Sequence, residues 1–389
     1  MLIDMMLRWT TLAAALAAVL LTTVIYAGPC QSQTYTEAAH EKPQGLWVVN
    51  AQFFDEFQGK SLQKSGSPSA TFALTFGECC PSFPDLTFDQ AGNLWIAFIA
   101  ELGVGVGELT RDELNPSKRV FRFHVELSLV ASGAADPFLY PSTLAFDPAG
   151  DLWVAGTAPT NTLIEFTPDQ LATSGNPTPA STINFSGDST VGPSQIQFDS
   201  AGDLWIAEET LVSDDSEAAI EYTPTQITEM QMGGSPTPIL TVLAGSGFFG
   251  ISAITFDKSG NLWMAVPNPG IGANGVAGGI VEMFNVAGKT GTLSQPNVVI
   301  TPAAISPINQ SLDRPSGLAF DNQGGLWVSS NLSSDQISGS RNSTGFIVKF
   351  AANQLGASGS PVPPIVLTPN HKASNLYHPS PIIFGPTAK

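Results

Sequence analysis

The stretch from Leu144 to Ala155 reads LAFDPAGDLWVA, and it decides the fold because close copies of it return along the chain. Two short apolar segments flank the polar residues 147–151. Pro148 suits the first corner of a type I turn, and Gly150 supplies the left-handed residue that a bulged hairpin requires. Asp147 is placed to accept hydrogen bonds from the turn amides. The stretch therefore predicts a tight β-hairpin, and the other copies are Leu86–Ala97, Ile196–Ala207, Ile254–Ala265 and Leu318–Ser329.

The aspartate of the repeat has two interpretations. A turn cap is the prediction, and metal ligation is the alternative. Both apply equally to every copy: Asp89, Asp147, Asp199, Asp257 and Asp321. The flanking segments are apolar without alternation, which indicates strands that are covered on both faces.

The tryptophans of the repeat count its units. Six of them follow a leucine, at spacings of 48 to 64 residues: Trp47, Trp95, Trp153, Trp205, Trp263 and Trp327. Further apolar segments after each tryptophan predict a third and a fourth strand, such as residues 163–166 and 181–185. Periods of this length with four strands each are typical of propeller blades.

The two chain ends each carry half of a repeat. Residues 45–49 provide a tryptophan strand without a strand before it, and residues 378–385 provide an inner strand with nothing after it. Joined, they complete one repeat and leave no open edge in the ring. The sequence therefore predicts an all-β fold, a six-bladed β-propeller of four-stranded blades over residues 41–389, with the sixth blade closed by both termini.

The N-terminal segment predicts export. Arg8 precedes an apolar run from Leu12 to Ile25, and a small-residue pattern ends at Ala27. Residues 1–27 are interpreted as a signal peptide, with an uncleaved signal anchor as the alternative, and residues 28–40 as a linker arm. The predicted location is secreted or periplasmic, with membrane attachment only through an uncleaved anchor.

The charge and the cysteine content limit the kinds of partner, disulfide and metal site that the chain can have. The net charge is −18 with only 12% charged residues, so the surface repels nucleic acid and anionic lipid. The three cysteines Cys30, Cys79 and Cys80 allow one disulfide in an oxidising compartment. Three pairings stay open, and the spacing does not suit a zinc site.

The repeat resembles the NHL-repeat superfamily of six-bladed propellers through the shared element P-x-x-[LI]-x-F-D-x-x-G-[ND]-L-W-[VIM]-A. Its GNLW version is also similar to the streptogramin B (virginiamycin B) lyase group, and more distantly to the regucalcin/gluconolactonase propellers. The resemblance implies a propeller over nearly all of the mature chain. It does not choose among lyases, lactonases and binding scaffolds. The lyase group uses a His–Glu pair with magnesium, and no local motif here matches that pair.

The long loops after the tryptophan strands predict the binding face. They share one end of the blades and cover residues 98–108, 208–218, 266–279 and 330–345. Length variation confined to one face of a repeat protein is typical of a binding surface. The predicted binding residues at this channel mouth are Asn50, Asp85, Glu208, Glu209 and Asn331. Four of these offer oxygen atoms that suit Ca²⁺ or Mg²⁺: Asn50, Asp85, Glu208 and Asn331. Hydrogen-bonded loop residues are the alternative interpretation.

Two residues are candidates for catalysis. Glu208 and His378 lie near the predicted mouth, and His378 could serve as a general base. The segment Tyr140-Pro141-Ser142 occupies the matching place in another repeat, which favours a structural position for His378. The serines before the inner strands have no elbow motif and no paired histidine, so nucleophilic catalysis is not predicted. Two functions follow. The first is a propeller that binds a small molecule or a protein or peptide partner through its loop face. The alternative is a metal-assisted lyase or lactonase-type hydrolase at the channel mouth.

Overall fold

The computed structural model describes residues 44–50, 53–75, 82–100, 103–115, 122–130, 139–157, 161–184, 191–210, 218–244, 250–267, 279–305, 311–331, 345–369, 376 and 379–387. The chain divides into two units between Lys42 and Pro43, and the description below concerns the second. The predicted signal peptide, the linker arm and the three cysteines lie outside the described residues. Among the described residues, no helix has the length and apolar character to cross a membrane.

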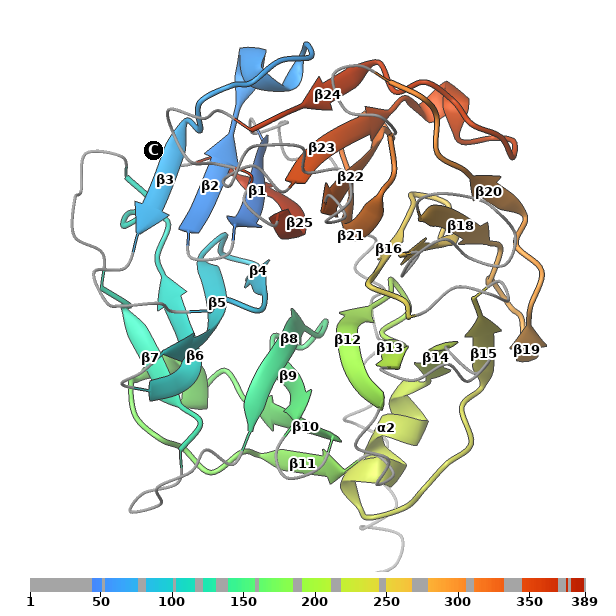
Figure 1. Cartoon of the computed structure of the whole chain (residues 1–389). Coiled ribbons are helices and arrows are strands. Elements are labelled where there is room, and N and C mark those ends of the chain that lie inside the picture. The colour runs from blue at the N-terminus through green and yellow to red at the C-terminus, as the bar shows by residue number, and fades with distance from the viewer. Residues whose placement is uncertain are drawn as a thin grey trace, which may run out of the picture. The chain divides into compact units, whose positions relative to one another are not determined.

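Six antiparallel sheets stand around a central axis, as the prediction required (Figure 1). Blade 1 consists of β4 (Leu86–Phe88), β5 (Leu94–Ala100), β6 (Gly103–Leu109) and β7 (Val125–Ser128). Blade 2 consists of β8 (Tyr140–Phe146), β9 (Leu152–Thr157), β10 (Asn161–Phe166) and β11 (Ser181–Asn184). Blade 3 consists of β12 (Val191–Phe198), β13 (Leu204–Thr210), β14 (Ala218–Tyr222) and β15 (Leu240–Leu243).

The remaining blades follow the same order from the axis outward. Blade 4 consists of β16 (Ala253–Phe256), β17 (Leu262–Val266), β18 (Ile280–Phe284) and β20 (Val298–Ile300). Blade 5 consists of β21 (Arg314–Phe320), β22 (Leu326–Asn331), β23 (Gly345–Phe350) and β24 (Ile365–Leu367). The strand β19 (Gly291–Leu293) adds a fifth, parallel strand to blade 3. The one α-helix of the described chain is α2 (Pro224–Gln231).

Blade 6 confirms the predicted closure. Its inner strand β25 (Pro379–Pro386) comes from the C-terminal end of the chain. Its outer three strands β1 (Gln44–Asn50), β2 (Phe53–Phe57) and β3 (Phe72–Thr75) come from the start of the described chain. In Figure 1 the blue β1 lies against the red β25, and Trp47 pairs with Ile383. The ring therefore has no open inner edge.

Apolar side chains hold neighbouring blades together. Trp47, Trp153, Trp205, Trp263 and Trp327 are among the largest fully buried side chains. Each tryptophan packs against a phenylalanine of the next blade, as Trp263 does against Phe320 at 5.7 Å between ring centroids. A buried side chain of this size contributes about 2–3 kcal/mol through removal from water. The tryptophan strand is therefore covered on both faces, as its unbroken apolar run predicts.

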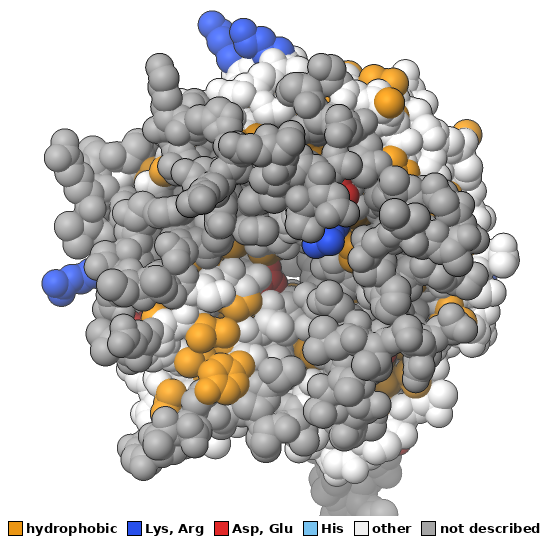
Figure 2. All heavy atoms as spheres, in the orientation of Figure 1, with side chains coloured by type: hydrophobic (Ala, Val, Ile, Leu, Met, Phe, Trp, Pro, Cys, Tyr) orange, Lys and Arg blue, Asp and Glu red, His pale blue; other side chains and the backbone are white. Residues whose placement is uncertain are grey.

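The inner strands leave a channel along the axis. Its cavity has a volume of about 290 Å³, and residues from the inner strands of all six blades line it, including Asp85, Gln195 and Pro381. Figure 2 shows an opening near the centre of the ring with acidic side-chain atoms beside it. This cavity, surrounded by the inner strands, is the candidate space for a ligand.

Candidate functional site

The turn end of the blades carries the aspartate of the repeat. Asp147 accepts hydrogen bonds through Oδ1 from the amides of Ala149 and Asp151, both at 2.9 Å. Gly150 has φ of 91°, the left-handed conformation predicted for it. The turn-cap interpretation is therefore confirmed for this hairpin. The sequence did not predict that Oδ2 also accepts from Nε1 of Trp153 at 3.1 Å.

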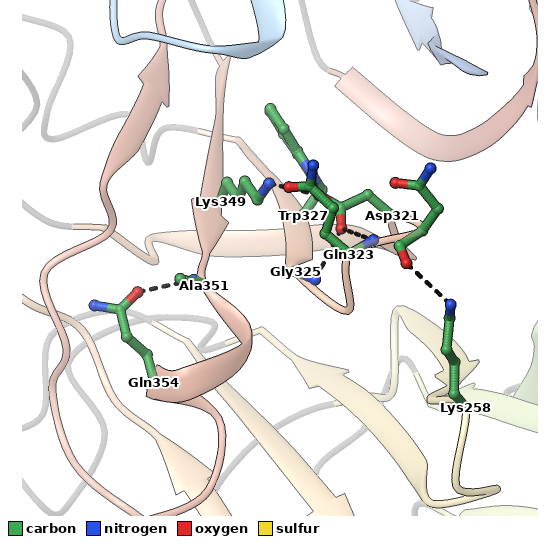
Figure 3. Close-up of polar contacts among 9 residues, drawn as sticks. Lys258, Asp321, Gln323, Gly325, Trp327, Lys349, Ala351 and Gln354 are labelled. Atoms are coloured by element: carbon green, nitrogen blue, oxygen red, sulfur yellow. Dashed lines mark hydrogen bonds and ion pairs between the residues drawn. The ribbon is translucent and has the colours of Figure 1, made fainter. Parts of the chain in front are cut away.

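The same bond recurs in five blades and varies in its third partner. In blade 5, Asp321 accepts from Nε1 of Trp327 at 2.9 Å, and Lys349 forms an ion pair with it at 2.6 Å (Figure 3). Burial raises the pKa of Asp321, but its hydrogen bonds and the charge of Lys349 outweigh burial and hold that pKa below its usual value. These contacts occupy the Asp321 carboxylate, so it serves the hairpin.

Blade 3 places three carboxylates at the same end. Ligand atoms of Asp199, Asp203 and Glu221 lie within 4.8 Å of one another, the one such cluster among the described residues. Burial, and then the charges of Asp203 and Asp199, raise the pKa of Glu221 to about 7. The carboxylates belong to the turn and its neighbouring strand. Of the three, only Asp199 was considered as a metal ligand from the sequence, as the alternative to a turn cap.

Asp85 lies in the channel and is fully engaged. It is 6% exposed, and its carboxylate accepts from the amides of Leu86 and Leu144 at 2.8 and 2.9 Å. It also accepts from Oγ1 of Thr143 at 2.8 Å. Burial raises the pKa of Asp85 to about 6. Asp85 therefore joins blade 1 to blade 2, and these bonds occupy the oxygens that a cation would need.

Similar bonds join the next blades at the same level. Oγ1 of Thr143 accepts from the amide of Ile196 at 3.1 Å, and Oε1 of Gln195 accepts from the amide of Ile254 at 2.6 Å. The serines before the inner strands also act between blades, since Oγ of Ser142 donates to the carbonyl of Pro193 at 2.7 Å. The hydroxyl of Ser142 thus takes part in a bond between blades.

Glu208 occupies the loop end of β13 in blade 3 and is half-buried. Burial raises its pKa above the usual value. The pKa of Tyr222 is raised by burial and then by the charge of Glu208. Glu209 follows in the same strand, and its side chain, like the whole of His378, lies outside the described residues. Glu208 is therefore a half-buried carboxyl group in blade 3, whereas Asp85 lies in blade 1.

Asn50 lies on the face of blade 6 that packs against blade 5, and Asn331 lies on the face of blade 5 that packs against blade 6. Leu46 and Val48 of β1 share a core cluster with Trp327 of β22, at the interface between blades 5 and 6. Because side chains two residues apart on a strand point the same way, Asn50 and Asn331 lie on the two facing surfaces of that interface. We call its loop end the mouth seam, formed by Asn50, Asp55, Ser329 and Asn331.

The mouth seam contains polar atoms without partners. Asn50 is fully buried; its Nδ2 donates to Oδ2 of Asp55 at 2.9 Å, while its Oδ1 accepts no hydrogen bond within the described structure. Oδ1 of Asn331 is likewise buried and unpaired there. Asp55 is 4% exposed, and burial raises its pKa to about 6. Buried acceptors without a donor are rare in folded proteins and point to a missing water, ion or ligand.

Two members of the seam were not predicted. Ser329 is fully buried and stands where four copies of the repeat end in alanine. Asp55 occupies the third-strand position that holds Ile164 and Ile220 in blades 2 and 3, as the pairing registers show. The departure from alanine in the fifth copy was the available signal for Ser329. The third strand of blade 6 lacked a full repeat before it, which concealed Asp55.

One predicted loop is wrong. Residues 98–108 were expected as a long loop, but β5 continues to Ala100 and β6 runs from Gly103 to Leu109. Gly105 and Gly107 permit this, since a Cβ on Gly105 would lie 2.4 Å from the carbonyl of Leu127, and one on Gly107 would strike the ring of Phe123. Alternating glycine lets neighbouring groups approach closely, so a glycine-rich run became a strand.

The fold and its channel define this chain as a six-bladed β-propeller. No family model matches its sequence, and no curated protein matches it. Among solved structures it is similar to a protein of unknown function from Bacteroides caccae, with 14% identity, a TM-score of 0.55, and coverage of 88% of this chain and 99% of that chain.

Two enzymes of known structure are also matched over most of this chain. The luciferin-regenerating enzyme has 14% identity, a TM-score of 0.47, and coverage of 84% of this chain and 93% of that chain. A virginiamycin B lyase from Staphylococcus aureus has 14% identity, a TM-score of 0.41, and coverage of 83% and 89%. Identity at this level does not extend the similarity to the chemistry.

Proposed function

We propose that this chain is an extracytoplasmic β-propeller that binds a small molecule or a peptide at the loop end of its channel. The observation that carries the proposal is the pair of buried, unpaired amide oxygens, Asn50 Oδ1 and Asn331 Oδ1. Leaving a buried acceptor unpaired costs about 1–3 kcal/mol. A ligand that offers N–H or O–H groups to the mouth seam recovers this cost on binding.

The electrostatics of the region favour the same class of ligand. The seam and channel hold Asp55 and Asp85, and the net charge of the chain is −18. Such surroundings attract donors and cations and repel anions. The ligand is thus a neutral or positively charged molecule with hydrogen-bond donors.

A binding panel tests this proposal. Calorimetric titration of amino acids, short peptides and polyols compares the unmodified protein with Asn331→Ala and Asn50→Ala. We expect at least one compound to bind, with affinity at least tenfold weaker in both variants. Asn176→Ala changes an exposed asparagine far from the seam and should bind as the unmodified protein does. Equal binding by all four proteins, or no binder in the panel, would refute the proposal.

A metal-assisted lyase or lactonase-type hydrolase is the second candidate. It draws support from the same oxygen atoms, since amide and carboxylate oxygens are the ligands that Ca²⁺ prefers. Titration with Ca²⁺ or Mg²⁺ alone decides between the two. Heat of binding that disappears in Asn50→Ala and Asn331→Ala favours the metal, and absence of heat leaves the binding protein.

Export has its own test. The apolar run after Arg8 and the small residues up to Ala27 support a cleaved signal. The protein recovered outside the cytoplasm should begin at Gly28 by N-terminal sequencing. A chain that retains Met1 in the membrane fraction would indicate the signal anchor instead.

A further inference from the structure

The outer strands of the propeller are closed by segments of the following blade. On β7 of blade 1, Gly175 donates its amide to the carbonyl of Glu126 at 2.9 Å and accepts from the amide of Ser128 at 2.8 Å. Oγ of Ser174 accepts from the amide of Glu126 at 3.1 Å. We call this arrangement the Ser–Gly latch, and it satisfies the outward backbone groups of β7 in a parallel pairing.

Two other blades repeat the latch. Ser358 and Gly359 close β20 of blade 4: the Gly359 amide donates to Val299 at 3.0 Å, and Ser358 Oγ accepts from Val299 at 3.0 Å. Ser65 and Gly66 close β24 of blade 5 in the same way, through Val366. On blade 3, β19 pairs in parallel with β15 and so covers the outer edge of that strand. For the outer strand of blade 6, residues 116–121 of the corresponding connection lie outside the described structure.

Among the described residues, blade 2 lacks this closure. Its outer strand β11 would receive the latch from the connection 223–238 of blade 3, which is three residues longer than its counterpart 167–179. The longer connection forms α2, and the amide of Gly234 turns back to the carbonyl of Glu229 at 2.9 Å. Within the described chain no segment pairs with the outer edge of β11. The helix contacts the blade instead, with Gln231 donating to Glu165 at 2.8 Å.

The pairing register of β11 shows which of its backbone groups point outward without a partner in the described chain. Thr182 pairs with Ile164 at the position where Glu126 pairs with Gly107. The amide and carbonyl of Thr182, and the amide of Asn184, therefore correspond to the groups that the latch binds on β7. The side chains of both Thr182 and Asn184 are exposed. An edge strand with free outward groups is a template for pairing with another chain.

We propose that the outer edge of β11 binds an extended segment of a partner protein that carries a Ser–Gly pair and lies parallel to β11. The same fold accepts such segments at three equivalent edges, with the same backbone groups engaged. Backbone hydrogen bonds provide the affinity in this mode of recognition, as in other cases of strand addition. The serine hydroxyl and the absence of a side chain on glycine provide the selectivity.

A peptide with the chain's own latch sequence is the probe. Fluorescein-labelled TSGNPTP, the sequence of residues 173–179, is titrated into the full chain and followed by anisotropy. We expect saturable binding, and slower hydrogen exchange of the Thr182 and Asn184 amides in the complex. Thr182→Pro removes the outward amide and should weaken binding at least tenfold, whereas the matched Thr182→Val keeps the amide and should bind normally. A peptide with proline in place of the glycine should not bind.

A loop graft tests whether the longer connection 223–238 is the reason that β11 has no Ser–Gly latch. Replacing residues 226–238 with QLATSGNPTP, the sequence of residues 170–179, restores the Ser–Gly pair and removes the three extra residues. The grafted chain should latch its own β11, protect Thr182 and Asn184 without peptide, and lose peptide binding. Circular dichroism and thermal unfolding establish that each variant is folded.

Three outcomes would overturn the proposal. The first is exchange at Thr182 and Asn184 in the free protein as slow as at Glu126 and Ser128, since the edge would already be covered. The second is absence of peptide binding to the folded, unmodified chain. The third is protection that rises with protein concentration together with dimerisation in ultracentrifugation, which would make a second copy the occupant.

Discussion

The two ends of a blade differ in what they repeat. At the turn end, five blades have the same bond from tryptophan Nε1 to aspartate Oδ2, at 2.9 to 3.4 Å. At the loop end, the residue that follows the shared part of the tryptophan strand differs in every blade: Asn50, Phe98, Gly156, Glu208, Val266 and Ser330. The turn end engages the aspartate of the repeat in five blades, whereas the mouth seam leaves the acceptors Asn50 Oδ1 and Asn331 Oδ1 open.

This difference indicates that the turn end contributes to stability and the loop end to recognition. A bond that recurs in five blades stabilises those five hairpins in the same way and carries no specificity. Positions that vary at one end create a surface that differs from blade to blade, which a ligand can recognise. Mutations at the turn end should therefore cost stability, and mutations at the mouth seam should cost binding.

The largest expected effect is at a tryptophan of the turn end. Trp263→Ala removes a side chain that is 2% exposed and should lower the free energy of unfolding by about 3–5 kcal/mol. Trp263→Phe keeps much of the packing but loses the bond to Asp257, and should cost less. Urea unfolding measures both. Equal costs would show that the hydrogen bond, and not the packing, dominates at this end.

Asp85 should make stability depend on pH. Its pKa is raised to about 6 in the folded state, so the folded protein holds a proton that the unfolded chain releases. Stability from this group is therefore present at low pH and is lost as pH rises from about 4 to 6, by about 3 kcal/mol at most. Asp85→Asn should flatten this part of the profile of urea midpoints between pH 4 and 7.5. An unchanged slope in the variant would contradict the prediction.

A single substitution at Lys349 gives blade 5 the residue that blade 4 has at the equivalent position. Lys349 pairs with Trp327 across the strands, as Met283 pairs with Trp263 in blade 4. Lys349→Met removes the ion pair to Asp321 and should cost about 1 kcal/mol, since both side chains are only partly buried. The pKa of Asp321 should rise toward its usual value, as followed by NMR titration.

The reciprocal substitution is the control. Met283→Lys places an ammonium group near Asp257 and should stabilise the protein by up to about 1 kcal/mol at neutral pH and low salt. A destabilisation by both substitutions would mean that packing of the methionine and lysine side chains, and not charge, decides the difference.

The smallest loss of stability is expected at the mouth seam. Asn331→Ala relieves the cost of about 1–3 kcal/mol of a buried, unpaired oxygen, and this offsets the packing that the substitution removes. The free energy of unfolding should therefore not fall by more than about 0.5 kcal/mol. The same variant should lose ligand binding. A loss of 2 kcal/mol or more would show that Asn331 holds the blades together, and would erase the contrast between the two ends.

The sequence by itself determined the number of blades, the closure by both termini and the turn cap of the repeat. These features are local or periodic: residues 147–151 contain their own turn chemistry, and six Leu-Trp pairs count the blades. The N-terminal export signal is of the same kind and remains a prediction.

Only the tertiary structure decided what lies across blade interfaces. Asn50 and Asn331 are 281 residues apart in the chain, and the ring closure places them on one interface. Asp85 looked like a ligand in the sequence, but Thr143 and Leu144 of the next blade occupy its oxygens. The open edge of β11 depends on a connection that begins after Tyr222. Contacts between segments far apart in sequence follow from how the blades pack, and no local pattern of residues encodes them.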